Sequence, residues 1–251
     1  MAIQITVKEN QAQGQFLNGA ILENKPIGFP QDGGSQKPIS NIFYWANAWS
    51  EVGGTIPEHP HKFFEIMSFV LGGDIEHYDT KNKQWLPLKK GDVQIIRAGN
   101  GISHSEKMNA GANIFQIWFD PNIMLTQNKE ASYSDYNASQ FKAINNGGVE
   151  TTYYSGVNGI VEMDTVVDIQ KISFKQNTSY KFPKKEGYVF TAYVLGKEKV
   201  SLNAQNLSQH DFVVVDDEDE LVIEATMGAE LFVIQTPKQV NYKLYNELVK
   251  F

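Results

Sequence analysis

Cysteine is absent from the 251 residues of the chain, which excludes disulfides, thiolate metal sites and cysteine nucleophiles. Arginine occurs once, at Arg97, and the formal net charge is −7, so general attraction to nucleic acid or to an anionic membrane is not expected. No apolar run approaches the length that a membrane span requires. The start of the chain lacks the basic and long apolar regions of a secretory signal. We therefore expect a cytoplasmic protein without a direct nucleic-acid or membrane partner.

Short apolar segments, separated by glycine-rich turns, occupy most of the chain. Hydrophobic residues make up 41% of it and aromatic residues 12%, enough for well-formed cores. One such segment, Ile66 to Leu71, ends at Gly72-Gly73, and similar segments follow without helical periodicity between them. This pattern predicts an all-β sandwich or barrel. A polar, weakly periodic stretch from Asp120 to Asn146 indicates a boundary, so we expect two domains, residues 1–130 and 131–251.

The two halves of the chain have a similar rhythm, which hints at a duplicated barrel. The segment Gly187 to Gly196 resembles Glu65 to Gly72, and His210 to Val215 resembles Gly91 to Ile96. Potential ligands do not repeat. Where the first half has histidines, the second half has aromatic residues and proline (Tyr180, Phe182 and Pro183). Only the N-terminal half is therefore expected to hold a metal.

Two triplets, His59-Pro60-His61 and His104-Ser105-Glu106, carry three of the five histidines. Residues two apart on a strand point to the same face, so two such pairs on facing strands could converge on one point. Three imidazoles and a carboxylate would suit iron, manganese, copper, nickel or zinc. Pro60 cannot donate to a sheet ladder, which favours a strand start, an edge or a bulge.

The spacing of residues around these triplets resembles a known superfamily. Gly53, His59, His61, Glu65 and Gly72 are spaced as in the first motif of the cupins. The stretch Gly91-Asp-Val-Gln followed by Ala98-Gly-x-Gly-Ile-x-His-Ser-Glu106 is similar to the pirin family of cupins. That resemblance implies a bicupin, with two double-stranded β-helix barrels in one chain and one divalent metal, Fe(II) by first choice, in the N-terminal barrel.

The resemblance to pirins also implies the ligand set His59, His61, His104 and Glu106. Cupins in general recruit the carboxylate at the position of Glu65, so Glu65 is the alternative ligand, or a carboxylate that faces the substrate. Mn, Ni, Cu and Zn remain open as the metal. Many pirins have glycine where this chain has Phe63. Strand alternation would place Phe63 on the face of His61 and Glu65, where it would narrow the substrate pocket.

The resemblance implies a metal-dependent dioxygenase that uses dioxygen to cleave a flavonol such as quercetin, with Glu106 or Glu65 as the base. One alternative is a non-enzymatic, redox- or metal-responsive regulator that binds a protein partner. A third, weaker alternative is a sugar or keto-acid isomerase. Of the other histidines, His77 is expected to be an ordinary hairpin residue and His210 an ordinary turn residue. Trp118 and Phe119 are expected to fill the barrel.

Overall fold

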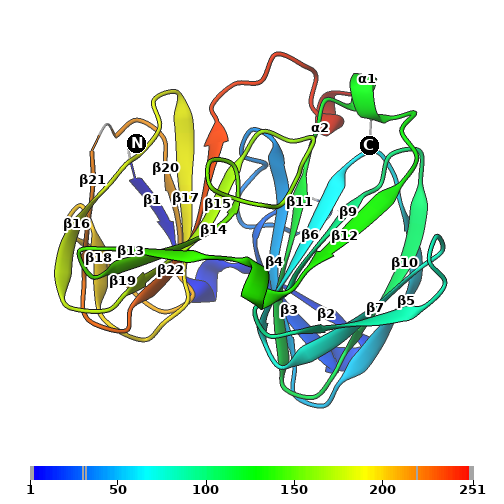
Figure 1. Ribbon diagram of the computed structural model, residues 1–251, viewed down its shortest axis with the longest axis horizontal. Helices are drawn as coiled ribbons and strands as arrows, with labels where there is room; N and C mark the ends of the chain where they lie inside the picture. Colours follow the sequence, from blue (N-terminus) through cyan, green and yellow to red (C-terminus); the bar gives the residue numbers. More distant parts are fainter. Residues whose placement is uncertain (1–2, 30, 32, 219, 249–251) are drawn as a thin grey trace. The chain divides into compact units, whose positions relative to one another are not determined.

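Antiparallel strands account for nearly all of the regular structure (Figure 1). The computed structural model describes residues 3–29, 31, 33–218 and 220–248. Its two α-helices, α1 (Ile123–Thr126) and α2 (Tyr245–Leu248), are one turn each, and short 3₁₀ turns lie at Lys8–Asn10, Leu17–Gly19 and Ala138–Gln140. The predicted all-β class is confirmed. Within the described ranges, no helix has the length and apolar character needed to cross a membrane.

The chain divides into two compact units. The N-terminal unit comprises Ala12–Gln140, Met163–Thr165 and the described part of Val240–Phe251. The C-terminal unit comprises the described part of Met1–Gln11, together with Phe141–Glu162 and Val166–Gln239. The boundary lies later than the one drawn from the sequence between residues 130 and 131. The reason is that strand β12 (Ser132–Tyr136) pairs with β9 (Val93–Arg97) of the N-terminal unit.

Two sheets form the N-terminal unit. One has seven strands in the order β12-β9-β6-β11-β4-β3-β2, and the other has four in the order β5-β10-β7-β8. The remaining bounds are β2 (Ala12–Phe16), β3 (Ile21–Ile27), β4 (Ile42–Ser50), β5 (Gly54–His61), β6 (Glu65–Gly72), β7 (Asp74–Asp79), β8 (Trp85–Lys89), β10 (Ile102–Met108) and β11 (Ala112–Phe119).

Burial along the strands follows their position in the sheets. β6 and β4 lie inside the seven-stranded sheet and are buried along most of their length, as their continuous apolar sequences predict. β5 lies at an edge of the four-stranded sheet, and its residues are exposed or half-buried except for the buried His61. Pro60 therefore sits on an edge strand, where its missing N–H costs no ladder bond. Phe119 is fully buried, on the face of β11 opposite that of its neighbour Trp118.

The C-terminal unit has two sheets of the same size, ordered β1-β20-β17-β22-β15-β14-β13 and β16-β21-β18-β19. Their bounds are β1 (Ile3–Thr6), β13 (Ala143–Asn146), β14 (Val149–Ser155), β15 (Asp168–Phe174), β16 (Thr178–Phe182), β17 (Tyr188–Val194), β18 (Val200–Leu202), β19 (Gln205–Leu207), β20 (Phe212–Val215), β21 (Leu221–Ala225) and β22 (Glu230–Pro237).

The order of strands supports the duplication that the sequence hints at. The pair β6–β9 and the pair β17–β20 take the same places in their sheets, and these are the segments whose sequences resemble each other. β16 takes the place of β5. Its Phe182 belongs to the apolar core of the C-terminal unit and Tyr180 packs against that core, whereas β5 carries histidines. The bicupin architecture is thus confirmed, with different contents in the two barrels.

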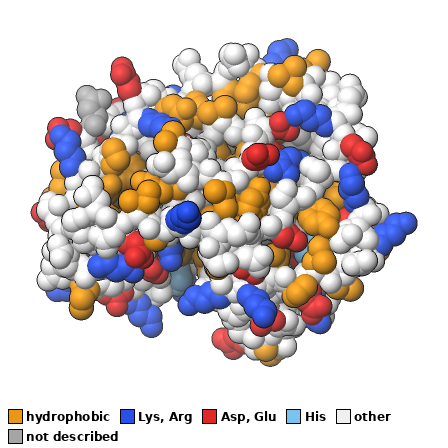
Figure 2. Space-filling model, in the orientation of Figure 1, with side chains coloured by type: hydrophobic (Ala, Val, Ile, Leu, Met, Phe, Trp, Pro, Cys, Tyr) orange, Lys and Arg blue, Asp and Glu red, His pale blue; other side chains and the backbone are white. Residues whose placement is uncertain are grey.

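The surface carries charges of both signs. On the face shown in Figure 2, acidic and basic side chains are interspersed, and no broad basic area is visible there.

Candidate metal centre

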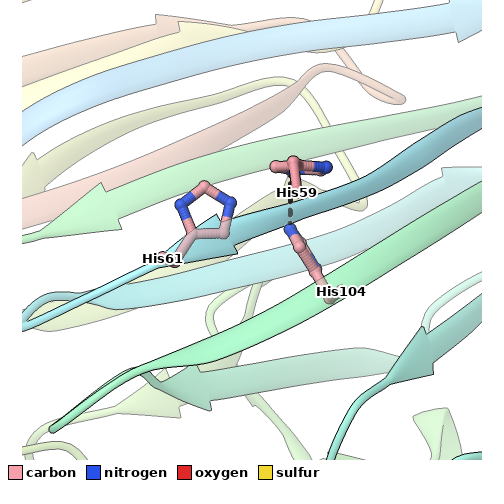
Figure 3. A group of neighbouring side chains, drawn as sticks. All are labelled: His59, His61 and His104. Carbon is pink, nitrogen blue, oxygen red and sulfur yellow. Dashed lines mark hydrogen bonds between the residues drawn. The ribbon is translucent and has the colours of Figure 1, made fainter.

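Strands β5 and β10 bring the three predicted histidines together. In the antiparallel register His59 lies opposite His104, and His61 lies opposite Ile102. Residues that are paired, or two apart on one strand, share a face, so all three imidazoles point to the same side of the sheet. Figure 3 shows the rings gathered around one space, two from β5 and one from β10. The convergence expected from the sequence is present in the fold.

A β-bulge lies beside these rings. The register shifts between His104 and Glu106. His104 pairs with His59 and Glu106 pairs with Ile56, so three residues along β5 correspond to two along β10. Bulges re-aim side chains and release backbone groups from the ladder. Here the carbonyl of Pro57 lies 2.8 Å from His59 Nδ1. That contact keeps the proton on Nδ1 and leaves the lone pair of His59 on Nε2, the atom that faces His104.

The nitrogen positions fit a metal ion. One ring nitrogen from each histidine lies within 4.8 Å of the other two. His59 Nε2 and His104 Nε2 are 3.0 Å apart, the separation of two neighbouring ligands that each lie about 2.1 Å from a metal. His61 Nε2 is buried and has no hydrogen-bond partner. A buried orphan of this kind is costly unless something binds it. The donor set therefore fits a divalent transition metal.

The local environment keeps two of these imidazoles uncharged. Burial, followed by the proximity of His104 and His59, lowers the pKa of His61 to about 3. Burial and the neighbouring His59 and His77 lower the pKa of His104 to about 2. Both rings are consequently neutral near pH 7, the form that binds a metal.

Glu106 follows His104 by two residues and is 3% exposed. Gln116 Nε2 donates to both of its carboxylate oxygens at 2.8 Å, and Ser68 Oγ lies 3.5 Å from one of them. The indole N–H of Trp118 donates to Gln116 Oε1 at 3.1 Å, which fixes the amide with its NH₂ toward Glu106. Among the described residues, the group of atoms within 4.8 Å holds the three imidazoles without Glu106. Glu106 lies beside the cluster, in a fixed orientation.

Glu65, the second candidate carboxylate, is engaged elsewhere. One oxygen accepts the backbone N–H of Asp164 at 2.8 Å, and the other accepts both the N–H and the hydroxyl of Thr165, at 2.9 and 2.6 Å. Burial raises the pKa of Glu65, and the bonds from Thr165 and Asp164 oppose that rise. The first cupin motif is therefore present at the expected spacing, but its carboxylate secures the segment Met163–Thr165.

Phe63 also lies away from the expected position. The strand alternation ends after His61, and Phe63 has a φ of +81°, outside the extended region. Its ring lines a small cavity of about 40 Å³ with Glu65 and Arg97. Phe64 takes the expected place instead, with its ring centroid 5.4 Å from that of His61 and stacked on Trp118 at 5.1 Å.

Two cavities meet at His61 and Trp118. The first, of about 720 Å³, is lined by aromatic residues that include Phe43, Phe64 and Tyr245. The second, of about 530 Å³, contains His59, His61 and Glu106 on its wall. Both volumes lie in the range of small-molecule sites. Trp118 was expected only to fill the barrel, whereas it lines both cavities.

The second cavity also has a polar wall that the sequence did not reveal. Lys25 Nζ lies 3.2 Å from Glu23 Oε1, and the Tyr44 hydroxyl donates to Glu23 Oε2 at 3.2 Å. Glu23 is 6% exposed and Lys25 13%. Charged residues on a strand usually indicate a solvated face, so nothing in the local sequence of β3 marks Glu23 and Lys25 as cavity residues. Gln116 likewise carries no local signal.

Comparison with known proteins finds similarity to pirins. The family model "Pirin" matches residues 38–119, the segment that holds all the candidate ligands. A curated quercetin 2,3-dioxygenase of Escherichia coli K12 is 27% identical over 192 residues, which cover 74% of this chain and 78% of that protein. Pirin-1 of Arabidopsis thaliana is 30% identical over 170 residues, covering 63% of this chain and 57% of that protein. The chain is thus similar to pirins, most specifically over residues 38–119.

Solved structures of pirins share the fold. YhhW from E. coli superposes with a TM-score of 0.79 at 20% identity, over 96% of this chain and all of that chain. Bacterial pirin YhhW from E. coli in complex with nickel(II) gives a TM-score of 0.77 at 19% identity, over 94% of this chain and 99% of that chain. At these identities the similarity establishes the two-barrel fold of this chain.

Proposed function

We propose that this protein is a metal-dependent dioxygenase of the pirin type that acts on a flavonol or a related small hydroxylated aromatic. The observation that carries the proposal is the group of three convergent imidazoles, two of them held neutral by burial, on the wall of a cavity of about 530 Å³. A relative named quercetin 2,3-dioxygenase, aligned over 78% of its length, supports the same activity.

The proposed ligands are His59, His61, His104 and Glu106. A divalent metal, Fe(II) by first choice, would supply Lewis acidity and redox chemistry at this point. Glu106 offers one carboxylate oxygen as a ligand and a second that can accept the proton of a substrate hydroxyl. Gln116 holds both oxygens in place. Glu65 is not proposed as the base, because Asp164 and Thr165 hold it against Met163–Thr165 and it lines the small cavity beside Phe63, whereas Glu106 lines the cavity that contains the imidazoles.

The second cavity suits a planar molecule with hydroxyl groups. Apolar side chains, Ile56, Ile75 and Ile114 among them, form much of its lining. Lys25, Glu23 and Tyr44 add donors and acceptors to the same lining. Such a combination of apolar walls and a few fixed polar groups orients a ligand of this class.

The test is oxygen consumption by metal-loaded protein with quercetin under air, with a nitrogen atmosphere as blank and elemental analysis of each preparation. We expect uptake that requires flavonol and falls at least 100-fold in His59→Ala and His104→Ala. His210→Ala, which removes a histidine from the other barrel, is the matched control and should retain wild-type turnover. Metal-loaded protein that binds flavonols without consuming oxygen would refute the dioxygenase and favour the regulatory alternative.

A further inference from the structure

His77 lies next to the histidine cluster, although its place in a hairpin predicted an ordinary turn-proximal residue. It is 1% exposed on β7, the strand that pairs with β10 on the side opposite β5. In that register His77 faces Glu106, and Asp79 faces His104. The ring centroids of His77 and His104 are 5.5 Å apart. A buried histidine in this position needs a partner for each ring nitrogen.

Asp79 determines which nitrogen of His77 carries the proton. Its carboxylate is fully buried, and Oδ2 lies 3.2 Å from His77 Nε2. The other oxygen accepts the backbone N–H groups of Lys81 and Asn82, at 2.8 and 2.7 Å, so the hairpin turn itself holds the carboxylate. An ionised carboxylate only accepts hydrogen bonds. In the neutral ring, His77 Nε2 is therefore the protonated nitrogen, and Nδ1 carries the lone pair.

Each of the two adjacent rings has one nitrogen without a hydrogen-bond partner. His77 Nδ1 and His104 Nδ1 are both buried without a hydrogen-bond partner. His104 Nε2 points at His59 and is the atom placed to bind a metal. A histidine that binds through Nε2 keeps its proton on Nδ1, and metal-binding histidines nearly always donate that proton to a neighbour. His104 thus requires an acceptor for its Nδ1–H, and His77, whose ring centroid lies 5.5 Å away, has an unused acceptor nitrogen.

We infer that His77, fixed by Asp79, is a positioning residue of the metal centre that accepts the Nδ1–H of His104 through one bridging water molecule. The chain Asp79–His77–His104 then fixes the tautomer and the plane of one ligand. This inference rests on the proposed metal site but not on the flavonol reaction. A purely structural His–Asp pair would account for Asp79, but it leaves the buried Nδ1 atoms of both rings unexplained.

The test is titration of metal-free protein with Ni²⁺ by calorimetry at pH 7.5, comparing wild type with His77→Phe, His77→Gln and Asp79→Asn. We expect 10- to 100-fold weaker binding in His77→Phe, the usual loss when such a partner is removed. His77→Gln should recover part of the affinity, because its amide oxygen can accept a hydrogen bond. Asp79→Asn should lie between wild type and His77→Phe. His210→Phe is the matched control and should bind as wild type does.

Spectra separate positioning from a loss of stability. The visible absorption bands of bound Co²⁺ report ligand geometry, and they should shift in His77→Phe at full occupancy. Thermal unfolding without metal identifies variants that are merely less stable. If His77→Phe does not fold, the Ni²⁺ affinities and Co²⁺ spectra of His77→Gln and Asp79→Asn test the inference instead. Variants with wild-type Ni²⁺ affinity and Co²⁺ spectra would overturn the inference while leaving the metal site intact. Absence of Ni²⁺ binding by the wild type would overturn both.

Discussion

Glu65 and Thr165, one hundred residues apart in the sequence, are joined by two hydrogen bonds to a single carboxylate oxygen. The N–H of Asp164 binds the other oxygen. This carboxylate stands at the position that many cupins use for metal binding, yet here it secures Met163–Thr165 against the N-terminal barrel. The two acids of the motifs, Glu65 and Glu106, therefore have separable roles: one maintains the fold and the other lies beside the imidazoles.

Replacing Glu65 should affect stability and leave metal binding unchanged. Glu65→Gln turns an NH₂ group toward N–H and O–H donors, and an unmet buried hydrogen bond costs about 1–3 kcal/mol. We expect that loss in the free energy of unfolding measured with urea, and Ni²⁺ affinity within twofold of wild type. Glu106→Gln should show weaker Ni²⁺ binding, and the exposed Glu51→Gln should change neither quantity. A large loss of Ni²⁺ affinity in Glu65→Gln would mean that Glu65, and not only Glu106, acts at the metal site.

Gln116 should control the geometry of Glu106. Its NH₂ contacts both carboxylate oxygens, and Trp118 holds the amide in that orientation. Gln116→Leu keeps the size of the side chain and removes the donor, so we expect about tenfold weaker Ni²⁺ binding in calorimetry. Asn113→Leu, on the same strand, is the control and should bind as wild type. Equal affinity in the two variants would mean that Glu106 needs no support from Gln116.

The face that each histidine occupies could be predicted from strand alternation, whereas the pairing of β5 with β10 that joins them was expected from the resemblance to the cupin motifs. His59, His61 and His104 lie on strands, where a spacing of two fixes the face, and the glycine framework makes those strands recognisable. Alternation failed at Phe63 because the chain leaves the extended region there, with φ at +81°. No pattern in the neighbouring residues predicts this change of backbone conformation at Phe63.

The long-range partners could not be predicted from local sequence. Whether Glu65 binds a metal or the loop depends on Thr165, which only the folded chain brings near. His77 looked like a hairpin residue, and its burial follows from the pairing of β7 with β10. Gln116 is a polar residue in a mostly apolar strand, and its contact with Glu106 depends on the pairing of strands across the barrel. In each case the sequence identifies the side chain but not the residue that it contacts in the fold.

Lys25 and Glu23 should determine which hydroxylated substrates bind. They form a nearly buried pair on the cavity wall shared with His59 and Glu106. Removing both charges, as in Glu23→Gln with Lys25→Met, avoids leaving one buried charge unpaired. We expect the affinity for quercetin to fall about tenfold, roughly 1.4 kcal/mol. The affinity for 3-hydroxyflavone, which keeps the 3-hydroxyl but lacks the hydroxyls on the two benzene rings, should fall less than twofold. Quenching of tryptophan fluorescence measures both, and equal losses would contradict a specific polar contact.

Asp120 should make the attachment of the C-terminal segment depend on pH. The Tyr245 backbone N–H donates to its carboxylate, and the Tyr242 hydroxyl donates to its backbone carbonyl at 2.8 Å. Tyr245 stacks on Phe43, with centroids 5.6 Å apart, and lines the larger cavity. Burial raises the pKa of Asp120 from 3.8 to about 7; the bond from Tyr245 opposes the rise and nearby Glu247 adds to it.

A raised carboxyl pKa means that the folded protein holds the Asp120 proton up to a higher pH than the unfolded chain does. Between about pH 4 and 7 the folded state then binds more protons, so this group's contribution to stability declines as the pH rises and is lowest above pH 7. The full effect is up to about 4 kcal/mol, at about 1.4 kcal/mol per pKa unit. Asp120→Asn cannot titrate. We therefore expect its free energy of unfolding, relative to wild type, to increase steadily from pH 4 to pH 8.

The difference between the two proteins isolates Asp120, because His61 and His104 titrate in both and their opposite pH dependence cancels. Hydrogen exchange locates the effect: after correction for intrinsic rates, amides of residues 242–248 should exchange faster at pH 8 than at pH 5.5 in wild type, and equally at both pH values in Asp120→Asn. A constant difference in stability across this range would show that the carboxyl of Asp120 is ionised throughout. The Tyr245 N–H would then outweigh burial as the determinant of its pKa.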